Sequence, residues 1–175
     1  MKKSKPFSKL SNSQKRVEIA KDVLIQLKNK RFKVRQNIYV QLPNYWDIIN
    51  RDRQANECVL DGTTTCQVCA KGALFMSHVM KTNHATIRQV QNIGNSMVRE
   101  RLDIFSTAQL DLIECAFEKR VVHDDSDTLK VYTDGKQFPT PLAKTAIRFG
   151  KKYKKKERLI AIIKNIIKNK GTFKP

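Results

Sequence analysis

One stretch of the chain, Thr65–Met80 (TCQVCAKGALFMSHVM), has almost no polar side and limits the fold more than any other segment. If Thr65 caps a helix here, small side chains recur at three- and four-residue spacing along one face. These small residues are Cys66, Cys69, Ala70, Ala73 and Ser77. Larger apolar side chains form a second face, and the polar residues left near the remaining strip are Lys71, His78 and Lys81. A helix that is apolar on both faces belongs in the centre of a domain, and Gly72 lets another backbone approach closely. The pattern therefore predicts a central helix near residues 66–81, crossed by one or two other helices.

The rest of the pattern predicts a single α+β domain, predominantly α-helical and compact, with a minor β element. At 175 residues and 40% hydrophobic content, the chain is long and apolar enough for one ordinary core. We expect a basic flexible arm over residues 1–10 and the domain over residues 11–175. The expected helices lie near residues 12–30, 66–81, 87–103, 107–119, 141–152 and 156–169. The β element is expected near residues 32–42, and a hairpin near residues 129–138.

Local signals mark several helix ends. Ser11 or Asn12 can cap the first helix, and Ser106 followed by Gln109 is a capping box. Thr140-Pro141 is typical of a helix start, because proline suits the first helical position. Gly171 is the expected stop after the last helix, whose isoleucines cover one broad sector.

The charge of the chain is concentrated at its two ends. The formal net charge is +19, yet residues 37–140 hold 11 Lys or Arg against 13 acids. Residues 1–36 hold 12 against 2, and residues 141–175 hold 12 against 1. Two strongly positive ends around a nearly neutral middle indicate a polyanionic partner.

The densest basic run places five lysines around one tyrosine, and it is the main candidate for nucleic-acid binding. Contacts of this kind to phosphates give salt-dependent affinity without sequence preference. The candidate residues are Lys151, Lys152, Tyr153, Lys154, Lys155, Lys156 and Arg158, together with Lys30, Arg31, Lys33 and Arg35. A solvated, solubilising run is the alternative interpretation of the same lysines.

The four cysteines allow three interpretations. Cys58, Cys66 and Cys69 with His84 have the residue types of a zinc site, although only one close cysteine pair exists. Cys66 and Cys69 at a helix start also resemble a redox dithiol. Buried, reduced cysteines that act as small apolar side chains are the third interpretation, and they would need no cofactor.

No apolar stretch approaches the roughly 18 residues that a membrane span needs, and no secretory leader is evident. We therefore expect a cytoplasmic protein with reduced thiols and no membrane partner. No nucleophile motif or glycine-rich phosphate loop is present, so the sequence points away from an enzyme.

Two segments resemble a group of small uncharacterised proteins of bacteriophages and bacteria. The first is CQVCAKGALFMS at residues 66–77, with the pattern C-x-V-C-A-x-G-A-L-F. The second is the ending ERLIAIIKNIIKNKGTFKP at residues 157–175, and the helix expected from Ser106 to Glu118 fits the same pattern. The resemblance implies a phage or mobile-element setting, hence the host cytoplasm, and one compact helical domain. It implies no activity, and the lysine-rich segment 127–156 looks like an addition to it.

The first functional hypothesis is a non-enzymatic, phage-type accessory protein that binds nucleic acid, DNA or RNA, through its basic terminal regions. A protein-interaction module that blocks or recruits a host factor is the second. A thiol- or zinc-dependent enzyme that uses Cys66 or Cys69 is the third.

Overall fold

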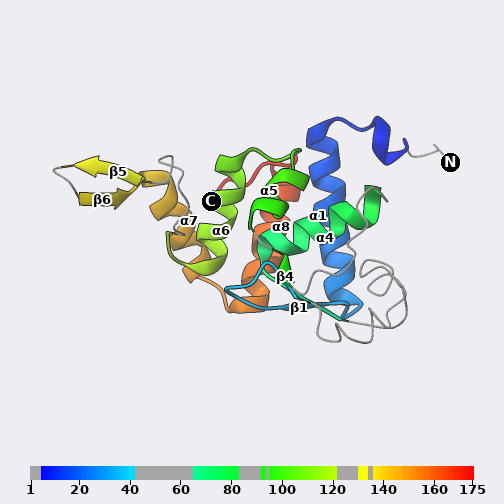
Figure 1. Cartoon of the computed structure of the whole chain (residues 1–175), viewed down its shortest axis with the longest axis horizontal. Coiled ribbons are helices and arrows are strands. Elements are labelled where there is room, and N and C mark those ends of the chain that lie inside the picture. Colours follow the sequence, from blue (N-terminus) through cyan, green and yellow to red (C-terminus); the bar gives the residue numbers. More distant parts are fainter. Residues whose placement is uncertain (1–4, 42–64, 83–91, 94, 122–129, 134–135) are drawn as a thin grey trace.

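The chain is an α+β protein dominated by helices (Figure 1). The computed structural model describes residues 5–41, 65–82, 92–93, 95–121, 130–133 and 136–175. Its helices are η1 Phe7–Lys9, α1 Asn12–Lys28, α4 Ala70–Thr82, α5 Asn95–Arg101, α6 Thr107–Glu118, α7 Pro141–Lys151 and α8 Lys155–Lys168. Its strands are β1 Phe32–Val34, β2 Val40–Gln41, β3 Cys66–Val68, β4 Asn92–Ile93, β5 Lys130–Thr133 and β6 Lys136–Pro139.

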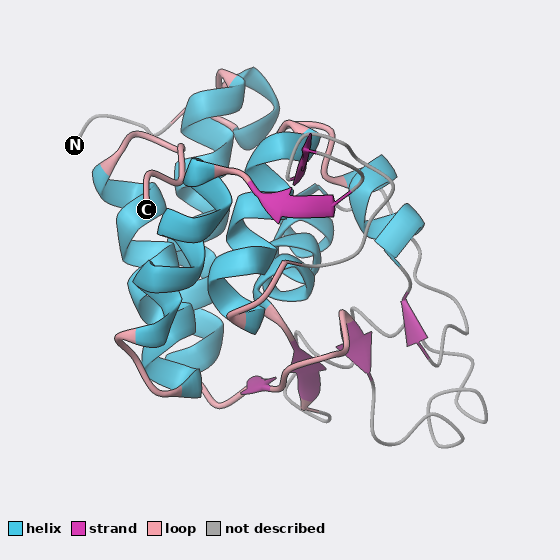
Figure 2. Cartoon of the chain, turned by 90° about the vertical axis from the view of Figure 1, so that its left-hand side faces the viewer, coloured by secondary structure: helices cyan, strands magenta, loops and turns pink. Residues whose placement is uncertain are grey.

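The helices gather into one body (Figures 1 and 2). Helix α4 packs against α1, α5 and α6, and it is buried along most of its length. Helices α1 and α8 lie side by side in opposite directions, since Ser13 near the start of α1 donates a hydrogen bond to the Lys170 carbonyl just after α8. Both helices bury branched aliphatic side chains in the core, including Ile19, Val23, Ile162 and Ile166. The sequence prediction of a predominantly helical α+β fold is confirmed.

Most of the predicted caps are present. Ser11 caps α1 in a capping box with Gln14, and Thr140 caps α7 with Pro141 at the first turn. Gly171 takes part in the end of the last helix, since its N–H donates to the Ile166 carbonyl at 2.8 Å and its φ is 90°. The first left-handed residue after the cap is Lys170, with a φ of 53°, so the stop begins one residue earlier than predicted. Ser106 caps α6 through the Gln109 N–H, but the Gln109 side chain instead binds the backbone of Phe173. Half of that capping box therefore serves to fasten the C-terminal segment to α6.

The prediction of one helix from Thr65 or Cys66 onward is wrong. Residues 66–68 form β3, which lies between β1, a parallel neighbour, and β2, an antiparallel one, in a sheet of order β1-β3-β2-β4. Cys66 and Val68 are buried while Gln67 between them is half-buried, and this period of two belongs to a strand. Helix α4 begins only at Ala70, and Cys69 occupies the cap position, where its carbonyl accepts the Ala73 N–H at 2.9 Å. A run of three residues is too short for its period to be decided from sequence.

The predicted strand over residues 32–42 is two strands. Asn37 has a φ of 62°, in the left-handed region, and so breaks the segment into β1 and β2 with a turn between them. The predicted helix near residues 87–103 is also shorter than expected. Residues 92–93 pair with β2 as strand β4, and α5 covers Asn95–Arg101; residues 87–91 and 94 lie outside the described residues.

The predicted hairpin near residues 129–138 is confirmed. Strands β5 and β6 pair in antiparallel fashion, with Val131 opposite Phe138. The hairpin stands at one end of the longest axis of the molecule, beyond α7 in Figure 1 and in front of the helices in Figure 2. Its described contact with the helical body is made through α7.

Part of the predicted flexible arm is packed on the domain. Residues 7–9 form η1, and the half-buried Phe7 contacts the core with its ring centroid 6.3 Å from that of His78. An aromatic side chain in an otherwise lysine-rich segment anchors this part of the arm, because its burial is favourable. Residues 1–4 of the predicted arm lie outside the described residues.

Candidate nucleic-acid interface

Basic side chains from four separate segments meet at one end of the helical body, which we call the basic end. Because α1 and α8 are antiparallel, the C-terminus of α1 lies beside the N-terminus of α8. Strand β1 contacts α8 and runs along the same lower edge of the molecule in Figure 1. The exposed members of the basic end are Lys28, Lys30, Lys33, Arg35, Lys119, Arg120, Lys151, Lys152, Lys154, Lys155 and Lys156.

A single carbonyl group ties three of these segments together. The Phe117 carbonyl, in the last turn of α6, accepts hydrogen bonds from the Arg158 guanidinium at 2.7 Å and from the Gln36 amide at 3.4 Å. Arg120 adds a second link, because its guanidinium donates to the Asn37 side chain at 2.9 Å. The turn after β1, the end of α6 and the start of α8 are thus held in one place by hydrogen bonds.

Arg158 is a structural residue, and its predicted role in nucleic-acid binding is wrong in this respect. Its side chain is 3% exposed and donates to three carbonyls, those of Gly150, Phe117 and Tyr153. Burial lowers the pKa of its guanidinium, which still carries its charge at neutral pH. With its donors turned inward, Arg158 holds the corner between α7 and α8 and offers no surface to a partner.

The other predicted residues lie at the basic end with differing degrees of exposure. Lys30 and Lys33 are exposed, as are all five lysines of residues 151–156, and Arg31 is half-buried. Arg35 is exposed but donates to the Gln67 side chain at 2.7 Å. Tyr153 is 37% exposed, and its ring lies 5.5 Å from that of Phe149 in a tilted arrangement. The structure therefore places the N-terminal and C-terminal candidates near one another, and it leaves their binding role a prediction.

Sequence reasoning missed Lys119 and Arg120. They belong to a part of the chain whose net charge is close to zero, so no local excess of lysine drew attention to them. Lys119 has a φ of 61° at the end of α6, and the chain turns there so that both side chains are exposed at the basic end. A basic pair just after a predicted helix is a usable signal, since cations favour helix C-termini.

Two described acids accompany these cations. Glu157 is exposed in the first turn of α8, where it suits the helix dipole. Glu118 is half-buried and accepts the Asn37 N–H at 3.2 Å. Burial raises the pKa of Glu118 above its ordinary value. The basic end is therefore strongly positive around neutral pH.

A cluster of charged side chains is buried in the middle of the fold. Lys71 is completely buried, and its amine forms ion pairs with Glu114 and, at 3.3 Å, with Asp111. Asp111 also accepts a hydrogen bond from Arg99 at 2.6 Å, and Glu114 accepts one from the Tyr39 hydroxyl at 2.8 Å. Lys71 was expected near the solvated strip of its helix, and that expectation is wrong. The ion pairs of Lys71 with Asp111 and Glu114 join α4 to α6.

The three cysteines that the structure describes, Cys66, Cys69 and Cys115, are buried, and this favours the packing interpretation for them. Cys66 lies on β3, whereas Cys69 lies at the start of α4, where its sulfur accepts the Gly72 N–H at 3.4 Å. Burial raises the pKa of Cys69 to about 12 and also raises that of Cys66, which opposes thiolate chemistry. The residues that the structure describes contain no group of three possible metal ligands. Cys58 and His84 of the candidate zinc set lie outside those residues.

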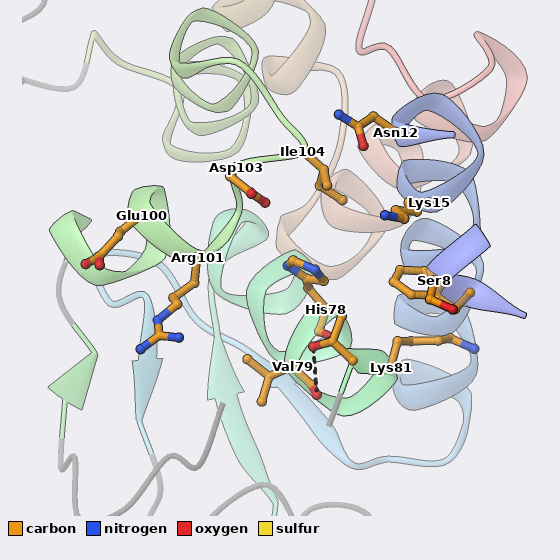
Figure 3. A pocket seen from close by; sticks show the side chains of 12 residues that line it. Ser8, Asn12, Lys15, His78, Val79, Lys81, Glu100, Arg101, Asp103 and Ile104 are labelled. Atoms are coloured by element: carbon orange, nitrogen blue, oxygen red, sulfur yellow. Dashed lines mark hydrogen bonds between the residues drawn. The ribbon is translucent and has the colours of Figure 1, made fainter. Parts of the chain in front are cut away.

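A hollow of about 900 Å³ opens beside α4, between η1 and the end of α5 (Figure 3). His78, Lys15 and Asp103 surround its middle, while Glu100 and Arg101 point away from it. Burial lowers the pKa of His78, so its imidazole is neutral at pH 7. The backbone of Arg101, which also lines the hollow, is hydrogen-bonded to this histidine.

Among the described residues, no helix is long and apolar enough to cross a membrane. Comparison of the chain with protein-family models, with curated proteins and with solved structures finds no match.

Proposed function

We propose that the protein is a non-enzymatic accessory protein that binds nucleic acid through the phosphates, with the basic end as its binding surface. The observation that carries the proposal is the convergence of cations from α1, β1, α6 and the start of α8 on that end. Cations spread along a chain attract a polyanion weakly, whereas cations held on one surface neutralise neighbouring phosphates together. The phage or mobile-element setting implied by the resemblance is part of the same proposal.

Phosphate binding predicts how steeply the affinity for nucleic acid falls as the salt concentration rises. If about five phosphates are neutralised by the lysines of residues 151–156, the slope of log affinity against log salt is roughly −4 to −5 for a duplex. The salt dependence separates phosphate binding from the solubilising interpretation, in which the lysines remain fully solvated.

The test is binding of a labelled 20-base-pair duplex and a labelled single strand across a salt series. In one variant, Lys151, Lys152, Lys154, Lys155 and Lys156 are all changed to Gln. The matched control changes five exposed lysines elsewhere, namely Lys9, Lys21, Lys164, Lys168 and Lys174, to Gln. We expect the first variant to lose most of the affinity and most of the salt slope, and the control to keep the greater part of both. Equal losses in the two variants, or affinity that is weak even at low salt, would contradict the proposal.

An acidic protein partner would also be attracted to the basic end, as in the alternative of an interaction module. Capture of partners from a bacterial lysate, with and without nuclease, distinguishes the two. Proteins that remain bound after nuclease treatment, and that are lost in the variant of residues 151–156, would favour the interaction module.

A further inference from the structure

The outer face of α7 extends the basic end along the side of the molecule. Helix α7, Pro141–Lys151, buries Ala143, Ala146 and Gly150, and its half-buried Ile147 and Phe149 also pack against the core. Its exposed residues are Pro141, Leu142, Lys144, Thr145, Arg148 and Lys151. About half the circumference of this helix is open to solvent, and three of its six exposed residues, Lys144, Arg148 and Lys151, are cations on one stripe of that half. The sequence PLAKTAIRFGK contains no acid to offset them.

The position of α7 makes this face accessible to a large partner. Together with the hairpin, α7 forms one end of the longest axis of the molecule (Figure 1). It is seated closely on α6, because Gly150 lies against the Ala116 carbonyl, where an added Cβ would come within 1.8 Å of the oxygen. Its last turn leads directly into Lys152–Lys156, so the cations of α7 and those of the basic end are continuous along the chain.

We propose that the outer face of α7 and the basic end bind double-stranded DNA as one surface, with α7 lying in the major groove. The proposal rests on the proposed function and specifies its substrate. A helix is about 10–12 Å across with its side chains, and the major groove of B-DNA is about 12 Å wide. At about 1.5 Å per residue, α7 is about 16 Å long, the length of about five base pairs. Lys144 and Arg148 then face the groove, and the lysines after α7 meet the flanking phosphates.

Two observations favour duplex DNA over other nucleic acids. Proteins that hold single strands use exposed aromatic rings on which bases stack. Among the side chains whose burial the structure describes, which do not include those of residues 131–138, the exposed large apolar ones are Ile25, Leu142 and Tyr153. The one aromatic of these, Tyr153, already packs on Phe149. Duplex RNA is disfavoured for a different reason, because its major groove is too deep and narrow to admit a helix.

The first experiment changes Lys144 and Arg148 to Ala, both exposed, and measures affinity for a DNA duplex, an RNA duplex and a DNA single strand of one sequence. The matched control changes the exposed Lys164 and Lys168 of α8 to Ala and removes the same charge. We expect the α7 variant to bind the DNA duplex about fivefold or more weaker than the control does, since a lost contribution of about 1 kcal/mol lowers affinity by about that factor. Its affinity for the single strand should match that of the control.

The second experiment locates the protein on the duplex by dimethyl sulfate, which methylates guanine N7 in the major groove and adenine N3 in the minor groove. Wild-type protein should protect guanine N7, and the α7 variant should lose that protection. If binding depends on the lysines of residues 151–156 but shows neither N7 protection nor a difference between the α7 variant and its control, the proposed function stands and groove binding by α7 is overturned. If no nucleic acid binds at low salt, both are overturned.

Discussion

Changing Gly72 to Ala tests how α4 is seated in the fold. In an ordinary helix this change stabilises by about 1 kcal/mol, because glycine is a poor helix former. In this protein a Cβ on Gly72 would lie 1.6 Å from the Tyr39 carbonyl oxygen and 2.5 Å from its carbonyl carbon. The carbonyl is held, since it accepts the Cys69 N–H at 3.2 Å, and the adjoining Val40 belongs to β2. Overpacking of this kind costs about 1–3 kcal/mol, and loss of the hydrogen bond costs about 1 kcal/mol more.

The net expectation for Gly72→Ala is destabilisation by about 2 kcal/mol, or a fall in Tm of about 4–8 °C for a chain of this size. Thermal and urea unfolding followed by circular dichroism measure it. Lys164, exposed in the middle of α8, supplies the control, because the difference between Lys164→Ala and Lys164→Gly reports helix propensity without a clash. If Gly72→Ala leaves Tm unchanged or raises it, the idea that the Tyr39 carbonyl leaves no room for a Cβ at position 72 is refuted.

Three further changes probe the buried charge, the histidine and the corner at α8. Lys71→Met should destabilise by about 3–5 kcal/mol in urea unfolding, because it leaves two buried carboxylates without their shared cation, whereas the half-exposed ion pair lost in Lys81→Met costs at most about 1 kcal/mol. Burial holds the pKa of His78 below 6.5, so the unfolded chain takes up this proton first and stability falls as the pH drops below that value. His78→Gln should reduce the fall of the urea midpoint below pH 6.5. An unchanged slope would refute the idea that protonation of His78 causes this fall. Arg158→Lys should lower stability by about 2–4 kcal/mol, since an amine cannot replace a planar group that donates to three carbonyls; a stable variant with weakened nucleic-acid binding would restore Arg158 to the interface.

The burial of Arg158 separates it from the neighbouring exposed lysines. Lys151–Lys156 and Arg158 are contiguous in the sequence, but only the lysines are exposed. Arg158 faces inward because it lies on the buried side of α8, four residues before the core residue Ile162. The five lysines and Arg158 therefore have separate roles, and a variant that neutralises all six would confuse lost binding with lost folding.

The helical part of the fold follows from local signals in the sequence. Ser11, Ser106 and Thr140 begin their helices as predicted, since a cap acts on backbone groups only two or three residues away. The isoleucine sector of α8 likewise predicts its buried face, because a period of 3.6 residues needs no knowledge of the partner helix. The aggregate positive charge of both termini is equally a property of the sequence alone.

Other features depend on residues that are distant along the chain, and only the tertiary structure decides them. Lys71 is buried because Asp111, 40 positions later, and Glu114 on the same helix supply the carboxylates that neutralise it. Residues 66–68 form a strand because β1 and β2 offer hydrogen-bonding edges on both sides, a fact that their own three side chains do not encode. The basic end exists because antiparallel packing of α1 on α8 and the shared Phe117 carbonyl bring separate cations together. Local charge, apolar periodicity and helix capping depend on residues close together in the sequence, so they can be predicted from it. Strand pairing, the burial of charged side chains and the convergence of basic side chains on one surface arise only when the chain folds back on itself.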